Sequence, residues 1–362
     1  MSRALPQVAV VGVLLFFILG IFLQLLNLVF SAWFVQVFVF VCLPWTFCRL
    51  SRQAPLDALG LSAAVPNKVA AGALLGMLCW LAVIVPLTHV TAPLFPASWK
   101  EMLDGRALFS SLEGVERALM VAAVVLAAPL GEEVFFRGFI QPRLIRRWGV
   151  PLGLLSTSVL FSLIHVDPVG FLARTALGLL FGWLAYASAS LWVSMAAHAC
   201  YNLLVCVLLF AFGGEASADA PWGQGVLFLW LVLGTAGMAV LLRVFGFFPP
   251  SPRKVVAPSP APPMSRWRIF RPWFLAAAGS LLLLVAVDYR GIALNMFDVA
   301  AAPLPSPHKK WDSPKAEEKR ERMKELRQKA RKGEVELKTY FEFRRGLLEE
   351  LLSRKAQQPK TS

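Results

Sequence analysis

The sequence predicts an all-α, polytopic integral membrane protein with about eight or nine transmembrane helices and a helical, soluble C-terminal tail. Of the 362 residues, 57% are hydrophobic and only 16% are charged, whereas a soluble domain averages about 45–50% apolar and about 25% charged residues. Apolar windows of about twenty residues recur along the chain, which is the length a helix needs to cross the hydrocarbon core. The end of the chain is charged and rich in good helix formers, and this predicts the tail.

The apolar windows follow one another at short intervals. We expect spans at residues 8–29, 31–48, 69–90, 117–146, 150–166, 168–187, 191–212, 222–242 and 272–288. The windows at 31–48 and 150–166 are the weakest of the set. The first window has no small-residue cleavage site at its end, so we interpret it as an uncleaved span rather than a secretory signal.

The net charge of +14 divides equally between the tail and the rest of the chain. Residues 309–360 hold 17 basic and 10 acidic residues. In the membrane part, the basic residues cluster in alternate loops, one of which is the turn at Arg143–Arg147. The positive-inside rule therefore predicts that this turn and the N-terminus are cytoplasmic. We expect a bacterial inner (cytoplasmic) membrane protein whose partner is the lipid bilayer, with no nucleic acid.

Proline-rich breaks and changes in composition divide the chain into five segments. We expect an N-terminal membrane hairpin at 1–68, a membrane core at 69–245, a Pro-rich linker at 246–271, a last span at 272–290 and a charged helical tail at 291–362. Prolines favour an extended, solvated linker. Gly333 lies inside the tail and predicts its division into two helices.

Very few ionisable residues interrupt the apolar segments between residues 118 and 214. The acidic ones are Glu132, Glu133 and Asp167, and the histidines are His165 and His198. An acidic residue at the centre of a membrane helix costs roughly 2.5–3.5 kcal/mol on the insertion scale. Such residues are candidates for function, because their burial is costly unless they face a partner or a cavity.

Helical spacing indicates how these polar residues are arranged. Glu133 and Arg137 are four residues apart, so they are neighbours on one face and are expected to pair. Glu132 points about 100° away from Glu133 and remains available for another task. His198 and Asn202 are also four apart and form one polar face of their helix. Asp167 and Arg174 are expected to form a second, structural pair.

A helical hairpin that turns at Trp148–Gly149 places two of these residues at one depth. Glu132 and His165 each lie roughly 24 Å from such a turn, at about 1.5 Å per residue. They can therefore meet across antiparallel helices. His198 reaches the same level only if the turn at Ser188–Ser190 is itself submerged or tilted.

Three motifs carry a resemblance to a known family. The sequences EEVFFR (132–137), FSLIH (161–165) and HACYN (198–202) are similar to the EExxxR, FxxxH and HxxxN motifs of the CAAX prenyl protease and bacteriocin-processing (CPBP, Abi) family. Each motif alone is weak, but three in the right order on apolar segments are a strong signal. The resemblance covers roughly residues 70–212.

The resemblance implies an intramembrane endopeptidase, that is, a hydrolase with a water-filled cavity. It implies Glu132 as the general base, His165 as a holder of the attacking water, His198 and Asn202 as donors to the oxyanion, and Glu133 with Arg137 as the pair that braces the site. The chemistry is reasonable, because peptide hydrolysis needs a positioned base and donors aimed at the developing charge.

The cofactor and the substrate are less constrained. Members of the family have also been described as metalloenzymes, and Glu132, His165 and His198 are the residues that can bind zinc with water in the fourth position. We favour the version that requires no cofactor. The expected substrate is a membrane-associated protein or peptide cleaved near its C-terminus or leader, and the sequence indicates neither the exact substrate nor the oligomeric state.

Two other classes of function fit parts of the pattern. A transporter or proton relay also carries acidic residues and histidines in membrane helices, but it predicts inverted repeats and broken helices, and we find no matching halves. A non-catalytic binding or immunity protein of the same fold is the second alternative. Loss of a motif residue would favour it, and none is lost.

Overall fold

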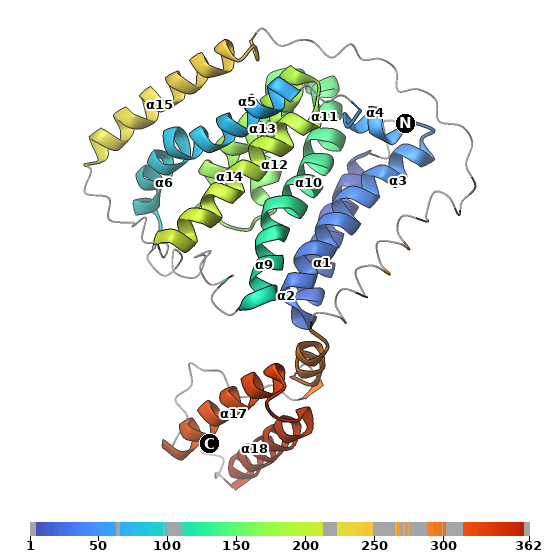
Figure 1. Cartoon of the computed structure of the whole chain (residues 1–362), viewed down its shortest axis with the longest axis vertical. Coiled ribbons are helices and arrows are strands. Elements are labelled where there is room, and N and C mark those ends of the chain that lie inside the picture. The colour runs from blue at the N-terminus through green and yellow to red at the C-terminus, as the bar shows by residue number, and fades with distance from the viewer. Residues whose placement is uncertain are drawn as a thin grey trace, which may run out of the picture. The chain divides into compact units, whose positions relative to one another are not determined.

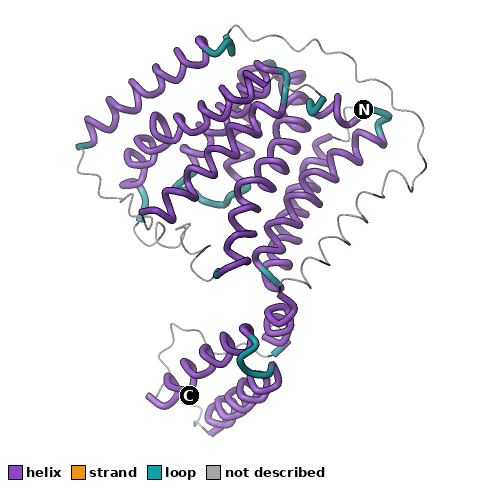
Figure 2. Tube along the Cα trace, in the orientation of Figure 1, coloured by secondary structure: helices purple, strands orange, loops and turns teal. Residues whose placement is uncertain are grey.

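The described part of the chain is helical throughout. The computed structural model describes residues 5–62, 66–96, 112–212, 223–248, 288–298 and 314–357, with a few isolated residues between these ranges. Figure 2 shows helices joined by short loops and no strand in these ranges. The chain is therefore an all-α polytopic membrane protein, as predicted. The N-terminal half contains α1 (Leu5–Leu26), α2 (Leu28–Val35), η1 (Gln36–Val41), α3 (Cys42–Leu50), α4 (Pro55–Leu59), α5 (Pro66–Cys79), η2 (Trp80–Ile84), α6 (Val85–Thr91) and η3 (Ala92–Leu94).

The helices that carry the three motifs follow (Figure 1). They are α9 (Gly114–Ala122), η4 (Ala123–Ala127), α10 (Ala128–Glu132), η5 (Glu133–Ile140), α11 (Gln141–Trp148), α12 (Val150–Leu163), α13 (Phe171–Ser188), α14 (Leu191–Phe212) and α15 (Gln224–Val244). The elements from α9 to α11 form one continuous helix. Gly149 separates it from α12 with φ of 81°, a value that glycine adopts readily, so the predicted hairpin turn is present.

Six of the described helices are long and apolar enough to cross a membrane, and Val150–Leu163 is a shorter apolar helix. The six are Leu28–Leu50, Pro66–Leu94, Gly114–Trp148, Phe171–Ser188, Leu191–Ala211 and Gly225–Val244. Each coincides with a predicted span. The predicted span at 8–29 falls on α1. The predicted linker at 246–271 and the span at 272–288 lie almost wholly outside the described residues, and the five-segment division of the chain stays a prediction.

Three membrane helices contain four π-helical turns, each shortly before a proline. At the end of each π segment a main-chain N–H bonds to the carbonyl five residues back, as Ala128 does to Ala123. The proline follows within three residues and cannot donate to the helix. Local π turns are a known way for membrane helices to accommodate proline. The four pairs are η1 with Pro44, η2 with Pro86, η4 with Pro129 and η5 with Pro142.

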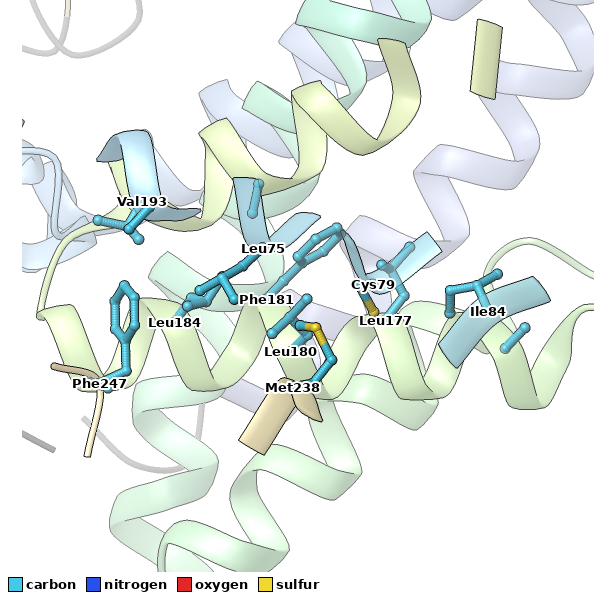
Figure 3. Close-up of a cluster of buried hydrophobic side chains, with 14 residues drawn as sticks. Leu75, Cys79, Ile84, Leu177, Leu180, Phe181, Leu184, Val193, Met238 and Phe247 are labelled. Atoms are coloured by element: carbon cyan, nitrogen blue, oxygen red, sulfur yellow. The ribbon is translucent and has the colours of Figure 1, made fainter. Parts of the chain in front are cut away.

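The contacts divide the chain into two compact units, and the first consists of residues 1–17 and 32–278. Its core is a cluster of buried apolar side chains from α5, η2, α13, α14 and α15 (Figure 3). Phe181 and Leu184 of α13 lie fully buried in this cluster, together with Leu75 of α5 and Val193 of α14. This cluster fixes α13 and α14, which both contribute to the candidate site.

The second unit consists of residues 18–31 and 279–362. In it, α17 (Pro314–Lys332) and α18 (Leu337–Gln357) pack on a helix over residues 288–298. Gly333, with φ of 81°, separates α17 from α18, so the predicted division of the tail is confirmed. Asp298 ties the unit together, because its carboxylate accepts a 2.7 Å hydrogen bond from the Tyr340 hydroxyl and pairs with Arg327 at 2.9 Å and Arg344 at 3.0 Å.

Candidate active site

Glu133 lies at the centre of the candidate site and is fully buried. Its Oε1 accepts a hydrogen bond of 2.9 Å from Arg137 Nη1, so the pair predicted from the four-residue spacing is present. The same oxygen lies 3.0 Å from Nδ1 of His198. Ser194, one turn before His198 on α14, lies near the same carboxylate, and its hydroxyl donates a 3.1 Å hydrogen bond to the carbonyl oxygen of Leu191. Glu133 therefore links the EExxxR helix to the HxxxN helix.

Arg137 is fixed by one main-chain acceptor and two aromatic rings in addition to Glu133, while its Nε has no hydrogen-bond partner among the described residues. Its Nη2 donates a 3.2 Å hydrogen bond to the carbonyl oxygen of Gly178 on α13. Its charged carbon lies 4.3 Å from the ring centre of Phe161 and 5.6 Å from that of Phe181, distances at which a cation is attracted to an aromatic face. Phe161 of the FxxxH motif thus has a packing role through its ring.

Glu132 faces a different set of partners from Glu133. It is 6% exposed, and its Oε1 accepts a 3.0 Å hydrogen bond from Nε2 of Gln36 on η1. Its Oε2 lies 3.9 Å from Nε2 of His198, which is too long for a direct hydrogen bond. The imidazole of His198 therefore lies between the two carboxylates of the motif, with one ring nitrogen toward each.

Close helix packing fixes the position of His198. A Cβ added to Gly72 or Gly76 of α5 would come within 2.7 Å of the carbonyl oxygen of Val193 or within 2.1 Å of that of Ala197. Small residues at four-residue spacing let membrane helices approach this closely. The His198 ring also stacks on Phe181, with ring centres 4.6 Å apart. These contacts leave the imidazole little freedom to move.

The turn before α14 is buried in the protein at the level of Gly138, ten residues before Trp148 along the long helix. Ser188 and Ser190 are both buried. At this turn Leu191 packs on Gly138 of η5, where an added Cβ would lie 2.9 Å from the leucine side chain. Because α14 runs antiparallel to the long helix from this contact onward, the carboxylates five and six residues before Gly138 meet His198, seven residues after Leu191.

The segment that covers this turn comes from the N-terminal part of the chain. The N–H of Leu191 donates a 3.0 Å hydrogen bond to the carbonyl oxygen of Gly60, just after α4. The indole N–H of Trp192 donates a 2.8 Å hydrogen bond to the carbonyl oxygen of Leu61. The loop at residues 59–61 therefore satisfies main-chain and side-chain donors where α14 begins.

His165 lies just beyond the end of α12. We expected it inside a helix that continues to residue 166, and this expectation was wrong. The helix ends at Leu163, and Val166 has φ of 49° two residues before Pro168, so the chain turns there. His165 Nδ1 lies 2.9 Å from the carbonyl oxygen of Phe161. This contact assigns the proton to Nδ1 and leaves Nε2 as an acceptor. His165 is within electrostatic range of Glu132 and His198.

The predicted pair of Asp167 and Arg174 is also present and supports the turn around His165. Arg174 Nη2 lies 2.5 Å from Asp167 Oδ2, and the N–H of Gly170 donates a 3.0 Å hydrogen bond to Oδ1 of the same carboxylate. Asp167 thus closes the loop between α12 and α13. This supports the structural role expected for the pair.

Asn202 lies one turn after His198 and contacts a different part of the long helix. Its Nδ2 donates a 2.7 Å hydrogen bond to the carbonyl oxygen of Val124 in η4. An amide nitrogen carries two hydrogens, so one N–H remains for a second acceptor. Asn202 is therefore anchored to the main chain of the helix that carries Glu132.

The proposed zinc ligands do not form a three-ligand site in this arrangement. Among the described residues, no three His, Cys, Asp or Glu side chains gather closely enough to hold a metal ion. Glu132 and His198 approach each other, but His165 does not lie close enough to join them as a third ligand. A catalytic zinc site needs three protein ligands at about 2.0–2.2 Å from the metal. The three residues are therefore not arranged as a zinc site in this structure.

Two residues of the site were not predicted from the sequence. Gln36 comes from an apolar span nearly a hundred residues before Glu132, and no local pattern marks it. Ser194 lies four residues before His198, so its helical spacing was a usable signal. Serine is common in membrane helices, however, and its partner Glu133 lies on another helix.

Comparisons with known proteins agree with the motifs. Residues 114–204 match the family model described as type II CAAX prenyl endopeptidase Rce1-like. A protein of Bacillus subtilis (strain 168) named "Putative membrane peptidase YdiL" is 28% identical over 109 residues. That match covers 30% of this chain and 44% of the relative, so the chain spans less than half the length of the relative it matches. No solved structure matches the chain.

The matched segment contains all six motif residues that form the candidate site. The resemblance to the CAAX prenyl protease family is therefore confirmed over this segment. The fold and the site together define an integral membrane protein whose motif-bearing helices are similar to those of the type II CAAX prenyl endopeptidase family.

Proposed function

We propose that this chain is an intramembrane endopeptidase that hydrolyses a peptide bond of a membrane-associated protein or peptide, near its C-terminus or leader, without a metal ion. The observation that carries the proposal is the position of His198 between the two carboxylates. Its Nδ1 lies 3.0 Å from Glu133 and its Nε2 lies 3.9 Å from Glu132. A general base, an oriented imidazole and a bracing ion pair are thus brought together in one buried place.

Glu132 acts as the general base. A water at a hydrogen-bonding distance of about 2.8 Å can contact both Glu132 Oε2 and His198 Nε2, since these atoms are 3.9 Å apart. Glu132 takes one proton from this water, and the resulting hydroxide attacks the scissile carbonyl carbon. The same carboxyl then gives its proton to the leaving nitrogen as the carbon–nitrogen bond breaks. Nε2 of His165, free as an acceptor, helps to hold the water.

His198 and Asn202 stabilise the oxyanion. Glu133 can only accept hydrogen bonds when ionised, so His198 donates from Nδ1. A second proton on Nε2 makes the imidazole a donor and gives a net charge of zero for Glu132, Glu133, Arg137 and His198 together. Such neutrality suits a site of low dielectric constant, where preorganised donors are most effective. The remaining N–H of Asn202 is the second donor.

The decisive experiment measures cleavage of a library of membrane peptides by purified wild type and Glu132→Gln, with products identified by mass spectrometry. We expect Glu132→Gln to lower the rate by about 10²–10⁴-fold, the usual contribution of a general base, with little change in melting temperature. The cleaved bonds in the library define the substrate class.

Two outcomes contradict the proposal. No cleavage by folded wild type across the library would favour a binding protein or a transporter. Stoichiometric zinc in the wild type, lost in His165→Ala, would overturn the metal-free mechanism and assign the same residues to metal binding.

A further inference from the structure

We infer that Gln36 is a positioning residue for Glu132, supplied by a helix outside the segment that resembles the peptidase family. The inference rests on the proposed function, because it assigns Gln36 a role in the same reaction. Gln36 lies in η1, whereas the family match begins at residue 114. The side chain therefore completes the site from a part of the chain to which no motif assigns a role.

The hydrogen bond of Gln36 divides the two oxygens of Glu132 between two tasks. Gln36 Nε2 donates to Oε1 at 3.0 Å, while Oε2 faces Nε2 of His198 at 3.9 Å. A donor on one oxygen fixes the rotation of the carboxylate and directs the other oxygen toward the imidazole. A general base must be held in such a geometry before its proton affinity matters.

A glycine next to Glu132 permits this contact. A Cβ added to Gly131 would lie 2.6 Å from both the main-chain oxygen and Oε1 of Gln36. Any larger residue at position 131 would therefore push η1 and its glutamine away from the carboxylate. The bare backbone at Gly131 lets Gln36 reach the next residue along the chain.

Other contacts fix η1 in place, so the position of Gln36 is not accidental. Phe40, one turn after Gln36, stacks on Phe135 with ring centres 4.7 Å apart. The indole N–H of Trp33, three residues before Gln36, donates a 3.0 Å hydrogen bond to the carbonyl oxygen of Leu119. The helix is thus held above and below Gln36 against the long helix that carries the EExxxR motif.

The partner of the Gln36 amide is what assigns it to the site. Its Oε1 is buried and has no hydrogen-bond partner among the described residues, and the same is true of Oε1 of Gln141. A buried polar atom without a partner lowers stability, so this oxygen alone does not distinguish the two glutamines. The difference is the acceptor: the amide N–H of Gln36 bonds to the carboxylate of Glu132, whereas that of Gln141 bonds to a main-chain carbonyl oxygen.

The test compares two glutamines of the membrane helices in the full-length protein. Gln36→Met removes the donor and keeps the volume, and we expect kcat to fall about tenfold with KM unchanged. Gln141→Met is the control, since Gln141 is more deeply buried than Gln36 and donates a 2.9 Å hydrogen bond to the carbonyl oxygen of Gly182, away from Glu132. We expect it to lower the melting temperature while kcat stays at the wild-type value. A wild-type kcat in Gln36→Met, or an equal loss in both variants, would overturn the inference.

Gly131→Ala gives an independent route to the same loss. Its methyl group displaces Gln36 without changing the amide, so we expect a similar fall in kcat. The double variant Gly131→Ala/Gln36→Met should then be no slower than the more impaired single variant, because both changes remove one interaction. If the fold-losses of kcat in the two single variants multiplied in the double variant, the two changes would act independently, and this would contradict the role of Gln36.

Melting temperatures separate failure of this inference from failure of the proposed function. Non-additive shifts for Gln36→Met and Glu132→Ala report the contact itself, whether or not any substrate is cleaved. Non-additive shifts without turnover in the wild type would refute the proposed function, and the catalytic role of Gln36 with it. Additive shifts with normal turnover would refute the Gln36 contact and leave the peptidase intact.

Discussion

The side chain of Asn202 donates a 2.7 Å hydrogen bond to the main-chain oxygen of Val124. In the π-helical turn of η4, the N–H of Ala128 bonds to the carbonyl of Ala123, five residues back. The next residue is Pro129, which has no N–H. The carbonyl of Val124 therefore lacks the equivalent donor, and Asn202 supplies one. The third motif is thus coupled to a proline that lies three residues before Glu132.

This coupling predicts that Asn202→Ala has two separable effects. We expect it to lower the melting temperature, because the Val124 carbonyl loses its donor, and to lower kcat, because the oxyanion loses one. Adding Pro129→Ala restores a main-chain N–H at position 129. The double variant should therefore recover melting temperature but not kcat. Recovery of both in thermal and kinetic measurements would show that Asn202 serves the helix alone.

The crossing of α5 and α14 predicts a position where one methyl group disturbs the site from a distance. In Gly76→Ala the new Cβ would lie 2.1 Å from the carbonyl oxygen of Ala197, so the two helices must separate and carry His198 away from Glu133. We expect a lower melting temperature and at least a tenfold loss of kcat.

Gly237→Ala on α15 is the matched control for Gly76→Ala. Nothing among the described residues lies within 4 Å of the new methyl group there, and alanine favours a helix over glycine by about 1 kcal/mol. This variant should be neutral or slightly stabilising. A harmless Gly76→Ala would contradict the close crossing.

The second unit is expected to lose stability at high pH through Tyr340. Burial and the neighbouring Asp298 carboxylate raise the pKa of Tyr340 above its usual range, which is near 10. The folded state therefore keeps the proton that the unfolded state releases, so the contribution of Tyr340 is complete below about pH 10 and falls as pH rises further. The melting temperature of the wild type should fall between pH 8 and pH 11, in part because of Tyr340. In Tyr340→Phe this fall should be smaller, since phenylalanine has no proton to lose. Identical pH dependence in both proteins would argue against the Asp298 contact.

Much of the fold follows from local sequence patterns. The length of the apolar windows predicted the spans, and the glycines predicted the helix breaks at Gly149 and Gly333. The four-residue spacing predicted the ion pair of Glu133 and Arg137. These features depend on neighbours along one helix, where geometry is regular. The sequence made the depth of His198 conditional on the position of the turn before α14, and the packing of Leu191 on Gly138 places that turn well before the end of the long helix.

The remaining features depend on residues that are distant in sequence. Gln36 reaches Glu132 only because the two helices approach each other closely at Gly131. No sequence pattern within η1 predicts this approach. The π turns were likewise missed, although Pro129 and Pro142 marked where the regular ladder of hydrogen bonds must fail. His165 was expected inside a helix because its apolar window continues to residue 166, whereas Pro168 ends the helix sooner.

The contact between Leu191 and Gly60 has a consequence for how the protein can be trimmed or transplanted. The match to the family model begins at residue 114, yet Gln36, Gly60 and Gly76 all precede that point. An isolated fragment cut at the limits of the similarity would lose the hydrogen-bond donor to Glu132, the loop that covers the turn before α14, and the helix surface on which α14 packs. The minimal working piece of this protein is therefore set by its three-dimensional neighbours, and a chimera that exchanges only the recognisable region should inherit the motifs without their support.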